Sequence, residues 1–398
     1  MKFLILNTDY AEFVSWLYTG HLGLERRPYE EQMRVRNESL FGWGDFYPRN
    51  LRTLGHEARN IYVNNEFMQK AWAQEHRVTV EEARPLDPRV RGTVQRARRA
   101  GYKTPLRLLR PLFLPLLKWL GSPQAWVWDI LAAQIRHYKP DILLNLHLHL
   151  STDFLREVRP YTRLLVGQHA SPLTQTQDYG VYDLMISSLP NFVDYFRLHG
   201  VASEYLPLGF EPAVLQRVGE PNQARGVSFV GSLFQVHGSR REWLEYVCER
   251  VPVRVWGHGF DDLPHNSAIF DCFKGTAWGV EMYRVLRDSL ITLNHHIDVA
   301  GPYANNMRLY EATGLGTLLI TDWKENLHEM FDPGREVVAY KSAQECVELT
   351  EYYLTHADER EAIARAGQQR TLSQHTYYQR MQELVDIVRK HLTPEPAM

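Results

Sequence analysis

Residues 305–322, with the sequence NNMRLYEATGLGTLLITD, place a short helical pattern directly before a short apolar run. Residues 306–313 carry apolar side chains at helical spacing. The run at 318–320 lies between Gly316 and Asp322 and is typical of a short buried strand. The small residues between the two patterns suit a tight turn. A helix that leads at once into a buried strand predicts an α/β fold.

Glu311 lies near the C-terminal end of this predicted helix. A carboxylate there opposes the helix dipole, so either water covers it or another group offsets the unfavourable interaction. An ordinary exposed glutamate and a carboxylate that binds a ligand both fit this position.

Short β-like runs alternate with helical segments along most of the chain. The runs span residues 2–6, 58–63, 141–148, 163–167, 183–188, 203–210, 226–231, 251–257, 290–296, 316–322 and 335–340. Strands separated by helices imply right-handed crossovers and parallel sheets. The polar, turn-rich stretch 211–225 divides the runs into two sets, so we predict two doubly wound domains, residues 1–212 and 213–398, facing a central cleft. The last predicted helix, about 377–392, has an apolar face that can pack back on the first domain.

Length and composition favour a cytoplasmic protein of two domains. The 398 residues exceed what one core usually holds, and a net charge of −2 argues against bulk nucleic-acid binding. Three widely separated cysteines form neither a disulfide framework nor a zinc site. The N-terminal apolar run is too short for a signal peptide, and no apolar stretch reaches the roughly 18 residues of a membrane span.

Residues 88–120 depart from the alternating pattern. They carry nine Lys or Arg and no acidic residue, and their second half is strongly apolar. This combination is typical of a segment that lies on a membrane surface or meets a lipid-linked acceptor. The alternative is an insertion that packs its apolar face on the first domain while its arginines stay in water.

Several familiar cofactor and metal motifs are absent from the sequence. There is no G-x-G-x-x-G after a strand, no G-x-x-x-x-G-K-[ST] and no D-x-D. The triplet HLH at 147–149 and the pair HH at 295–296 fall on predicted strands, where neighbouring side chains point to opposite faces, so they are poor metal ligands. We therefore expect neither a metal nor a bound cofactor.

The stretch VSFVGSLFQVHGSRREW predicts a strand, a polar loop and a helix that begins near Arg240 and Arg241. A helix N-terminus with adjacent arginines favours a diphosphate through its amides, its dipole and its charge. Two solvated surface arginines are the alternative. Gly257, which ends the next predicted strand, suggests a similar turn.

Taken together, these motifs resemble the nucleotide-sugar domain of GT-B glycosyltransferases, in the group-1, family-4-like and CgeB-like branch. The resemblance covers about residues 226–392 and rests on SFVGS, NNMRLYEATGLGTLLITD, FDPGREVVAY and ADEREAIARAGQQRTLSQHTYYQRM. It implies a GT-B fold of two Rossmann-like domains, with Glu311 accepting hydrogen bonds from the ribose hydroxyls and amides near residues 313–316 facing the phosphates. The donor-binding residues that it implies are Gly231, Ser232, Arg240, Arg241, Gly257, Asn306, Arg308, Glu311, Thr313 and Gly314.

The sequence departs from the family pattern at two points. Family-4 enzymes often carry a second glutamate eight positions before the first, where this chain has Tyr303. The glycine-rich loop after the first strand is replaced by NTDYAEF. Retention and inversion of the sugar configuration therefore both stay open.

The first half resembles the acceptor-side domain of the same family. KPDILLNLH followed by RLLVGQHASP is similar to two consecutive strands, the second ending in a histidine near the transferred sugar, here His169. A histidine can take a proton near neutral pH or hold a sugar hydroxyl. Asp9 and Asp45 are rival bases, and Arg240 or Arg241 would assist departure of the nucleoside diphosphate in place of a metal.

The resemblance implies a metal-independent glycosyltransferase that moves a sugar from a nucleotide-sugar donor to an acceptor hydroxyl. The expected acceptor is a glycan or a lipid-linked intermediate of bacterial cell-surface polysaccharide biosynthesis. A sugar-nucleotide 2-epimerase and a catalytically inactive nucleotide-sugar-binding protein are the alternatives. The nucleotide, the sugar and the oligomeric state leave no readable trace in the sequence.

Overall fold

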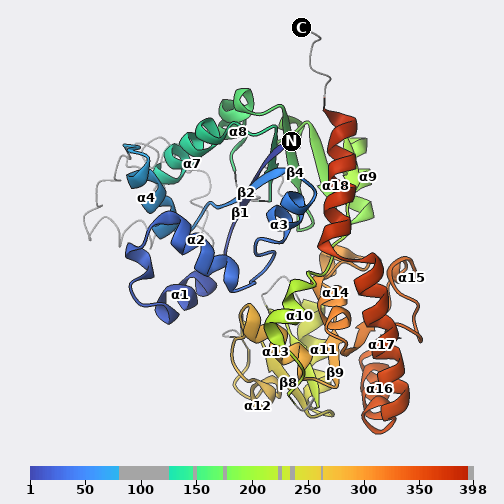
Figure 1. Ribbon diagram of the computed structural model, residues 1–398. Coiled ribbons are helices and arrows are strands. Elements are labelled where there is room, and N and C mark those ends of the chain that lie inside the picture. The colour runs from blue at the N-terminus through green and yellow to red at the C-terminus, as the bar shows by residue number, and fades with distance from the viewer. Residues whose placement is uncertain are drawn as a thin grey trace, which may run out of the picture.

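A computed structural model describes residues 1–79, 125–146, 150–173, 177–222, 226–233, 238–260 and 263–392. These residues form two parallel sheets, each covered by helices (Figure 1). The basic segment 88–120 and the HLH triplet at 147–149 lie outside the described residues. Among the described helices, none combines the length and the apolar character needed to cross a bilayer.

The first sheet has six parallel strands in the order β2-β1-β3-β4-β5-β6. Its strands are β1 Lys2–Asn7, β2 Glu57–Tyr62, β3 Ile142–Asn145, β4 Leu164–Gln168, β5 Leu184–Ser187 and β6 Ser203–Tyr205. The helices of this half are α1 Ala11–Gly20, α2 Tyr29–Glu38, α3 Phe46–Thr53, α4 Glu66–Glu75, α7 Ala125–Tyr138, α8 Thr152–Val158 and α9 Pro190–Leu198.

The second sheet has five parallel strands in the order β11-β10-β9-β7-β8. Its strands are β7 Val227–Val230, β8 Val253–Trp256, β9 Ile291–Asn294, β10 Leu318–Asp322 and β11 Val338–Tyr340. The helices are α10 Ala213–Val218, α11 Gly238–Cys248, α12 Ile269–Cys272, α13 Val280–Arg287, α14 Met307–Gly314, α15 Leu327–Met330, α16 Ala343–Thr355, α17 Ala357–Gln374 and α18 Tyr377–His391. In both sheets the strand order reverses beside the first strand, which is the mark of a doubly wound sheet.

The strand predictions are confirmed, because each predicted run overlaps one strand of the two sheets. The central strands are buried on both faces, and all five residues of β10 are buried. Burial on both faces explains why these strands appear in the sequence as continuous apolar runs. Gly316 makes the turn between α14 and β10 with a φ of 76°, a conformation that favours glycine.

The chain returns to the first sheet at its C-terminal end. Helix α18 runs from the second sheet towards the first, past α9 (Figure 1), and packs on α3, where the rings of Phe46 and Tyr377 lie 5.3 Å apart. Thr376 and Gln379 form a capping box that starts the helix. The predicted boundary at residues 212 and 213 falls between β6 and β7.

A second contact between the halves is aromatic. Trp278 of the second half is 5% exposed and packs against Phe13 and Phe41 of the first half. Beside it, the main-chain N–H of Val280 donates to the carbonyl of Ser39 at 2.9 Å. These contacts help to hold the two halves together.

Candidate functional site

The first turn of α14 is tied to the carboxyl ends of two central strands. The Asn306 side chain caps the helix by accepting from the N–H of Arg308 at 2.8 Å, and its Nδ2 donates to Oδ1 of Asn294, the last residue of β9, at 2.8 Å. Nη2 of Arg308 donates to the carbonyl of Val230, at the end of β7, at 3.2 Å. Together with Glu311, these residues are called the α14 site below. Ligands of doubly wound sheets bind at such strand ends.

Glu311 is 5% exposed, so the structure excludes an ordinary surface glutamate. Its Oε2 lies 2.6 Å from Nη1 of Arg308, one helical turn earlier, and its Oε1 accepts from the hydroxyl of Tyr283 at 3.4 Å. A buried carboxylate requires such a charged partner, and Arg308 offsets the unfavourable helix dipole. Nε of Arg308 is buried without a hydrogen-bond partner in the described part of the chain.

Arg240 lies on α11, at the predicted helix start, and is 5% exposed. Its Nε and Nη2 donate to the carbonyl of His295 at 3.1 and 2.6 Å, and its Nη1 donates to the carbonyl of Ser232 at 3.2 Å. Burial lowers the pKa of Arg240 to about 10, so the group stays charged at neutral pH. Three of its five N–H groups therefore serve the main chain, whereas Arg241 beside it is only half-buried.

Glycine is required at position 257 for a steric reason. Gly257 has a φ of 155°, and a Cβ there would lie 1.7 Å from the carbonyl oxygen of Gly231. The main-chain N–H of Gly231 donates to the carbonyl of Trp256 at 3.0 Å. The loops that follow β7 and β8 thus approach too closely for any larger residue at position 257.

The prediction that amides near the end of α14 face phosphates is wrong. The N–H groups of Leu315, Gly316 and Thr317 donate to carbonyls of α14 itself at 3.2, 2.8 and 3.1 Å. A helix C-terminus presents carbonyl oxygens rather than free amides, and carbonyl oxygens repel a phosphate. The side chain of Thr313 bonds to Thr371 of α17 at 2.6 Å, and Gly314 lies against the ring of Phe210, so both residues pack the interior.

His296 and Asp322 form a pair that the sequence analysis missed. His295 and His296 follow β9 rather than lying on it, and Asp322 ends the neighbouring strand β10. Oδ1 of Asp322 accepts from the main-chain N–H of His296 at 2.9 Å and from its Nδ1 at 2.6 Å, while Nζ of Lys324 lies 3.4 Å from Oδ2. Burial alone would raise the pKa of the Asp322 carboxyl, but His296, His295 and Lys324 together hold that pKa well below its usual range.

The ring of His296 is almost wholly buried, with 2% of the residue exposed. Its Nε2 has no hydrogen-bond partner among the described residues. The sequence signal for this pair was that polar residues stand at the ends of two successive predicted strands. When such strands are parallel neighbours, these residues meet at one edge of the sheet.

His169 follows β4 and is also 2% exposed. Its ring stacks on Phe192 with the centroids 5.6 Å apart and meets Tyr179 edge-on at 5.6 Å. Both ring nitrogens are buried without a hydrogen-bond partner of ordinary geometry in the described ranges. Burial lowers the pKa of His169 to about 4, opposed by a weaker interaction with the backbone of Ser171, so the ring is neutral at pH 7.

The rival bases Asp9 and Asp45 are both engaged by arginines. Asp9 is 5% exposed and accepts from Nε of Arg36 at 3.2 Å and from Nη2 of the same residue. Asp45 pairs with Arg49 at 2.7 Å and with Arg52 at 3.7 Å. As bases, both carboxylates would first have to leave these partners.

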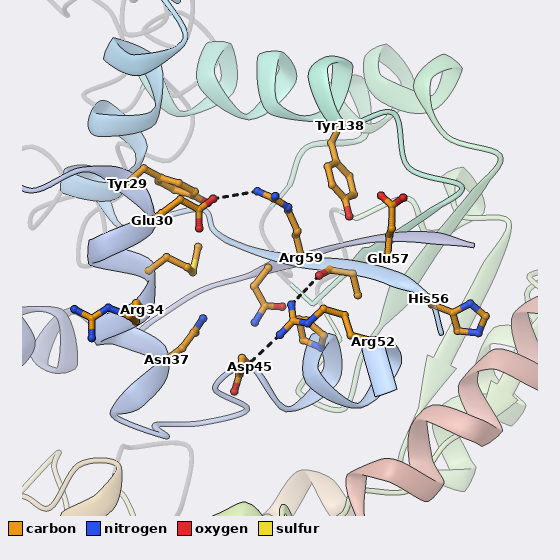
Figure 2. A pocket seen from close by; sticks show the side chains of 14 residues that line it. Tyr29, Glu30, Arg34, Asn37, Asp45, Arg52, His56, Glu57, Arg59 and Tyr138 are labelled. Carbon is orange, nitrogen blue, oxygen red and sulfur yellow. Dashed lines mark hydrogen bonds and ion pairs between the residues drawn. The ribbon is translucent and has the colours of Figure 1, made fainter. Parts of the chain in front are cut away.

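Asp45 lines a cavity of about 580 Å³ between α2, α3, β2 and Tyr138, called the edge pocket below. Figure 2 shows two of its ion pairs, Glu30 with Arg59 and Asp45 with Arg52. The edge pocket follows the outer strand of the first sheet and shares no residue with the α14 site. No group of three or more His, Cys, Asp or Glu side chains that could hold a metal ion is found in the described residues.

Comparison with known proteins assigns the class of fold. Residues 239–386 match a family model described as glycosyl transferase-like. Over 99% of its length the chain is similar to all of a glycosyltransferase from Rickettsia africae, with 12% identity and a TM-score of 0.56. The sequence matches no curated protein.

Two further solved structures share this architecture. Alr3699/HepE from Anabaena, in complex with UDP and glucose, is similar over 98% of this chain and 100% of its own, with 12% identity and a TM-score of 0.55. The sucrose-phosphate synthase from Thermosynechococcus elongatus is similar over 98% of this chain and 99% of its own, with 11% identity and a TM-score of 0.54. The chain has the two-domain GT-B fold, as predicted.

Proposed function

We propose that the protein transfers a sugar from a nucleotide-sugar donor to an acceptor hydroxyl, with the donor bound at the α14 site. One observation carries this proposal. Asn306 bonds to the end of β9, and Arg308 bonds to the end of β7 and pairs with Glu311; all three residues belong to the segment that matches the glycosyl transferase-like family. Strand ends of this kind are where doubly wound sheets bind nucleotides.

Glu311 is the group proposed to bind the ribose. It is buried beside Arg308, and the lone pairs of its carboxylate that Arg308 and Tyr283 do not use can accept hydrogen bonds from hydroxyls. His169 is the group proposed on the acceptor side, because a neutral imidazole can hold a hydroxyl or take its proton. Asp9 and Asp45 are less suited, since arginines engage both.

The acceptor proposed is a glycan or lipid-linked intermediate of bacterial cell-surface polysaccharide synthesis, met in the cytoplasm. The basic and apolar segment 88–120 motivates the lipid-linked form. Metal-independent transfer is also part of the proposal, since the sequence has no D-x-D motif. The complexes of Alr3699/HepE with UDP and with UDP-glucose make UDP-glucose the first donor to try.

The test is thermal stabilisation by UDP-, GDP-, dTDP- and CMP-sugars, with and without EDTA. At a ligand concentration of about 100 Kd the expected stabilisation is about 2.7 kcal/mol. Glu311→Gln should lose most of it, because an amide accepts from hydroxyls more weakly than a carboxylate. Glu383→Gln is the matched control, since Glu383 pairs with an arginine three residues earlier, Arg380 on α18, just as Glu311 pairs with Arg308.

Stabilisation by one nucleotide class, unchanged by EDTA and lost only in Glu311→Gln, is the expected result. No stabilisation by any nucleotide sugar would contradict the proposal. Incubation of the stabilising donor without acceptor then separates the alternatives, since a 2-epimerase converts the donor alone. An inactive binding protein would neither transfer nor hydrolyse it.

A further inference from the structure

A donor diphosphate needs cationic or N–H partners that are free to receive it. Arg240 has committed three N–H groups to main-chain carbonyls, and Arg308 is paired with Glu311. Lys324 donates to the carbonyl of Gly301 at 2.8 Å and lies near Asp322. Each of these side chains already serves the structure around the strand ends.

His296 differs, because one of its ring nitrogens is held and the other is free. The ionised carboxylate of Asp322 can only accept, so Nδ1 of His296 carries the hydrogen of their 2.6 Å contact. The two nitrogens of an imidazole point in divergent directions, so Nε2 faces away from Asp322 and from the end of β10. This nitrogen is buried and has no partner within the described ranges, which is a costly arrangement unless a ligand completes it.

His296 also lies where the chain leaves the second sheet for the first. Directly after it, Ile297, Val299 and Tyr303 pack against the hydrophobic cluster on one face of the first sheet. Ala300, in the same segment, is a fully buried member of that cluster. The free nitrogen is therefore at the junction of the two domains, where a donor held by the second sheet would meet an acceptor on the first.

The charges around this pair favour an anion. Asp322 is the acidic partner of His296, and Nζ of Lys324 lies 3.4 Å from Oδ2 of Asp322 as a positive neighbour. Arg240, bonded to the carbonyl of His295, adds a further positive charge. An anion beyond the ring would let both nitrogens donate, Nδ1–H to Asp322 and Nε2–H to the ligand.

We propose that His296 binds the diphosphate of the donor through Nε2, with Asp322 as its positioning residue. This inference rests on the proposed function. When the bond between the anomeric carbon and the phosphate oxygen breaks, its electron pair stays on the diphosphate, and the hydrogen bond from Nε2 strengthens. The acceptor oxygen forms the new bond to the anomeric carbon, and its proton passes to a base on the first domain.

The test compares nucleoside diphosphates with monophosphates by titration calorimetry, using UDP with UMP, GDP with GMP, dTDP with dTMP and CDP with CMP. His296→Asn keeps an N–H for Asp322 and removes Nε2. It should lower the affinity for the diphosphate at least about tenfold, the usual effect of losing a hydrogen bond to a charged group, and change that for the monophosphate less than about twofold. If His296 has a purely structural role, the substitution should lower the affinities for the diphosphate and the monophosphate by the same factor.

Two further variants sharpen the result. The affinity ratio is the affinity for the nucleoside diphosphate divided by that for the monophosphate. Asp322→Asn should lower this ratio, because it removes the charge that holds Nδ1–H of His296 in place. His295→Asn is the matched control, since its ring stacks on Trp243 at 5.0 Å and bonds to the hydroxyl of Tyr340 at 3.0 Å. That variant should leave the ratio within about twofold.

The outcomes separate the two proposals. If wild type binds a diphosphate but His296→Asn keeps the full ratio, the role of His296 is wrong and the proposed function stands. If wild type binds no nucleotide, both fall together. Should the variant not fold, the imidazole ¹⁵N signals of wild type decide: added diphosphate should shift the Nε2 signal of His296, and an unchanged signal on binding would overturn the inference.

Discussion

Two strand-end histidines, one on each sheet, show how the same residue type is prepared for different chemistry. His169 and His296 each follow a parallel strand and are each 2% exposed. His169 has aromatic neighbours, and burial lowers its pKa to about 4. His296 has Asp322 at 2.6 Å. Burial without an acid produces a neutral ring suited to a hydroxyl, whereas burial beside an acid produces an oriented ring suited to an anion.

The acids of the two sheets show a parallel difference. Asp9, beyond β1, has both oxygens on the buried Arg36, and this pair lies within the first half alone. Asp322 ends β10 of the second sheet and Glu311 lies on α14, and both belong to the segment that matches the glycosyl transferase-like family. We therefore expect the first pair to act mainly on stability and the second group mainly on ligand binding.

The largest effect on the free energy of unfolding is expected for Asp9→Asn. It leaves Arg36, which is 1% exposed, without its charge partner and should lower the free energy of unfolding by about 3–5 kcal/mol. Urea unfolding measures this loss. Asp45→Asn is the control. The side chains of its arginine partners are 35% and 51% exposed, so this substitution should lower the free energy of unfolding by less than about 1 kcal/mol. Equal losses in the two variants would contradict the structural role of Asp9.

The next effect is the pH dependence produced by His169. Its folded pKa of about 4 lies below the unfolded value of about 6.5, so the unfolded chain binds more protons between these values. Its contribution is complete above pH 6.5 and is lost as the pH falls towards 4, by up to about 3 kcal/mol. Urea unfolding at several pH values should show a shallower slope for His169→Gln than for wild type, and identical slopes would disprove the lowered pKa.

The smallest effect compares two tyrosine hydroxyls. Tyr283 donates to the Glu311 carboxylate at 3.4 Å, and Tyr47 donates to the Gln168 amide oxygen at 3.3 Å. Tyr283→Phe should cost about 1.5 kcal/mol of unfolding free energy and Tyr47→Phe about 0.5–1 kcal/mol, because bonds to charged groups are stronger. Differential scanning calorimetry of the pair tests the order, and a greater loss in Tyr47→Phe would reverse the comparison.

The sequence was sufficient for the fold because buried parallel strands leave continuous apolar runs. It also located Glu311 correctly on a short helix before β10. Apolar runs and helical spacing are local signals, which a single sequence carries directly.

The site was harder to predict because its contacts are not local. The pairing of His296 with Asp322 depends on β9 and β10 being neighbours, and that of Asp9 with Arg36 depends on how α2 packs. Arg240 looked free on its helix, but the turn after β9 brings the carbonyl of His295 to it.

The most direct test of the central claim is hydrogen–deuterium exchange with the nucleoside diphosphate that binds best. The account predicts slower exchange at residues 294–311 and 322–324, around the α14 site and the His296–Asp322 pair, and no change at residues 45–60 of the edge pocket. Protection confined to the edge pocket, with unchanged exchange at the strand ends of the second sheet, would contradict it.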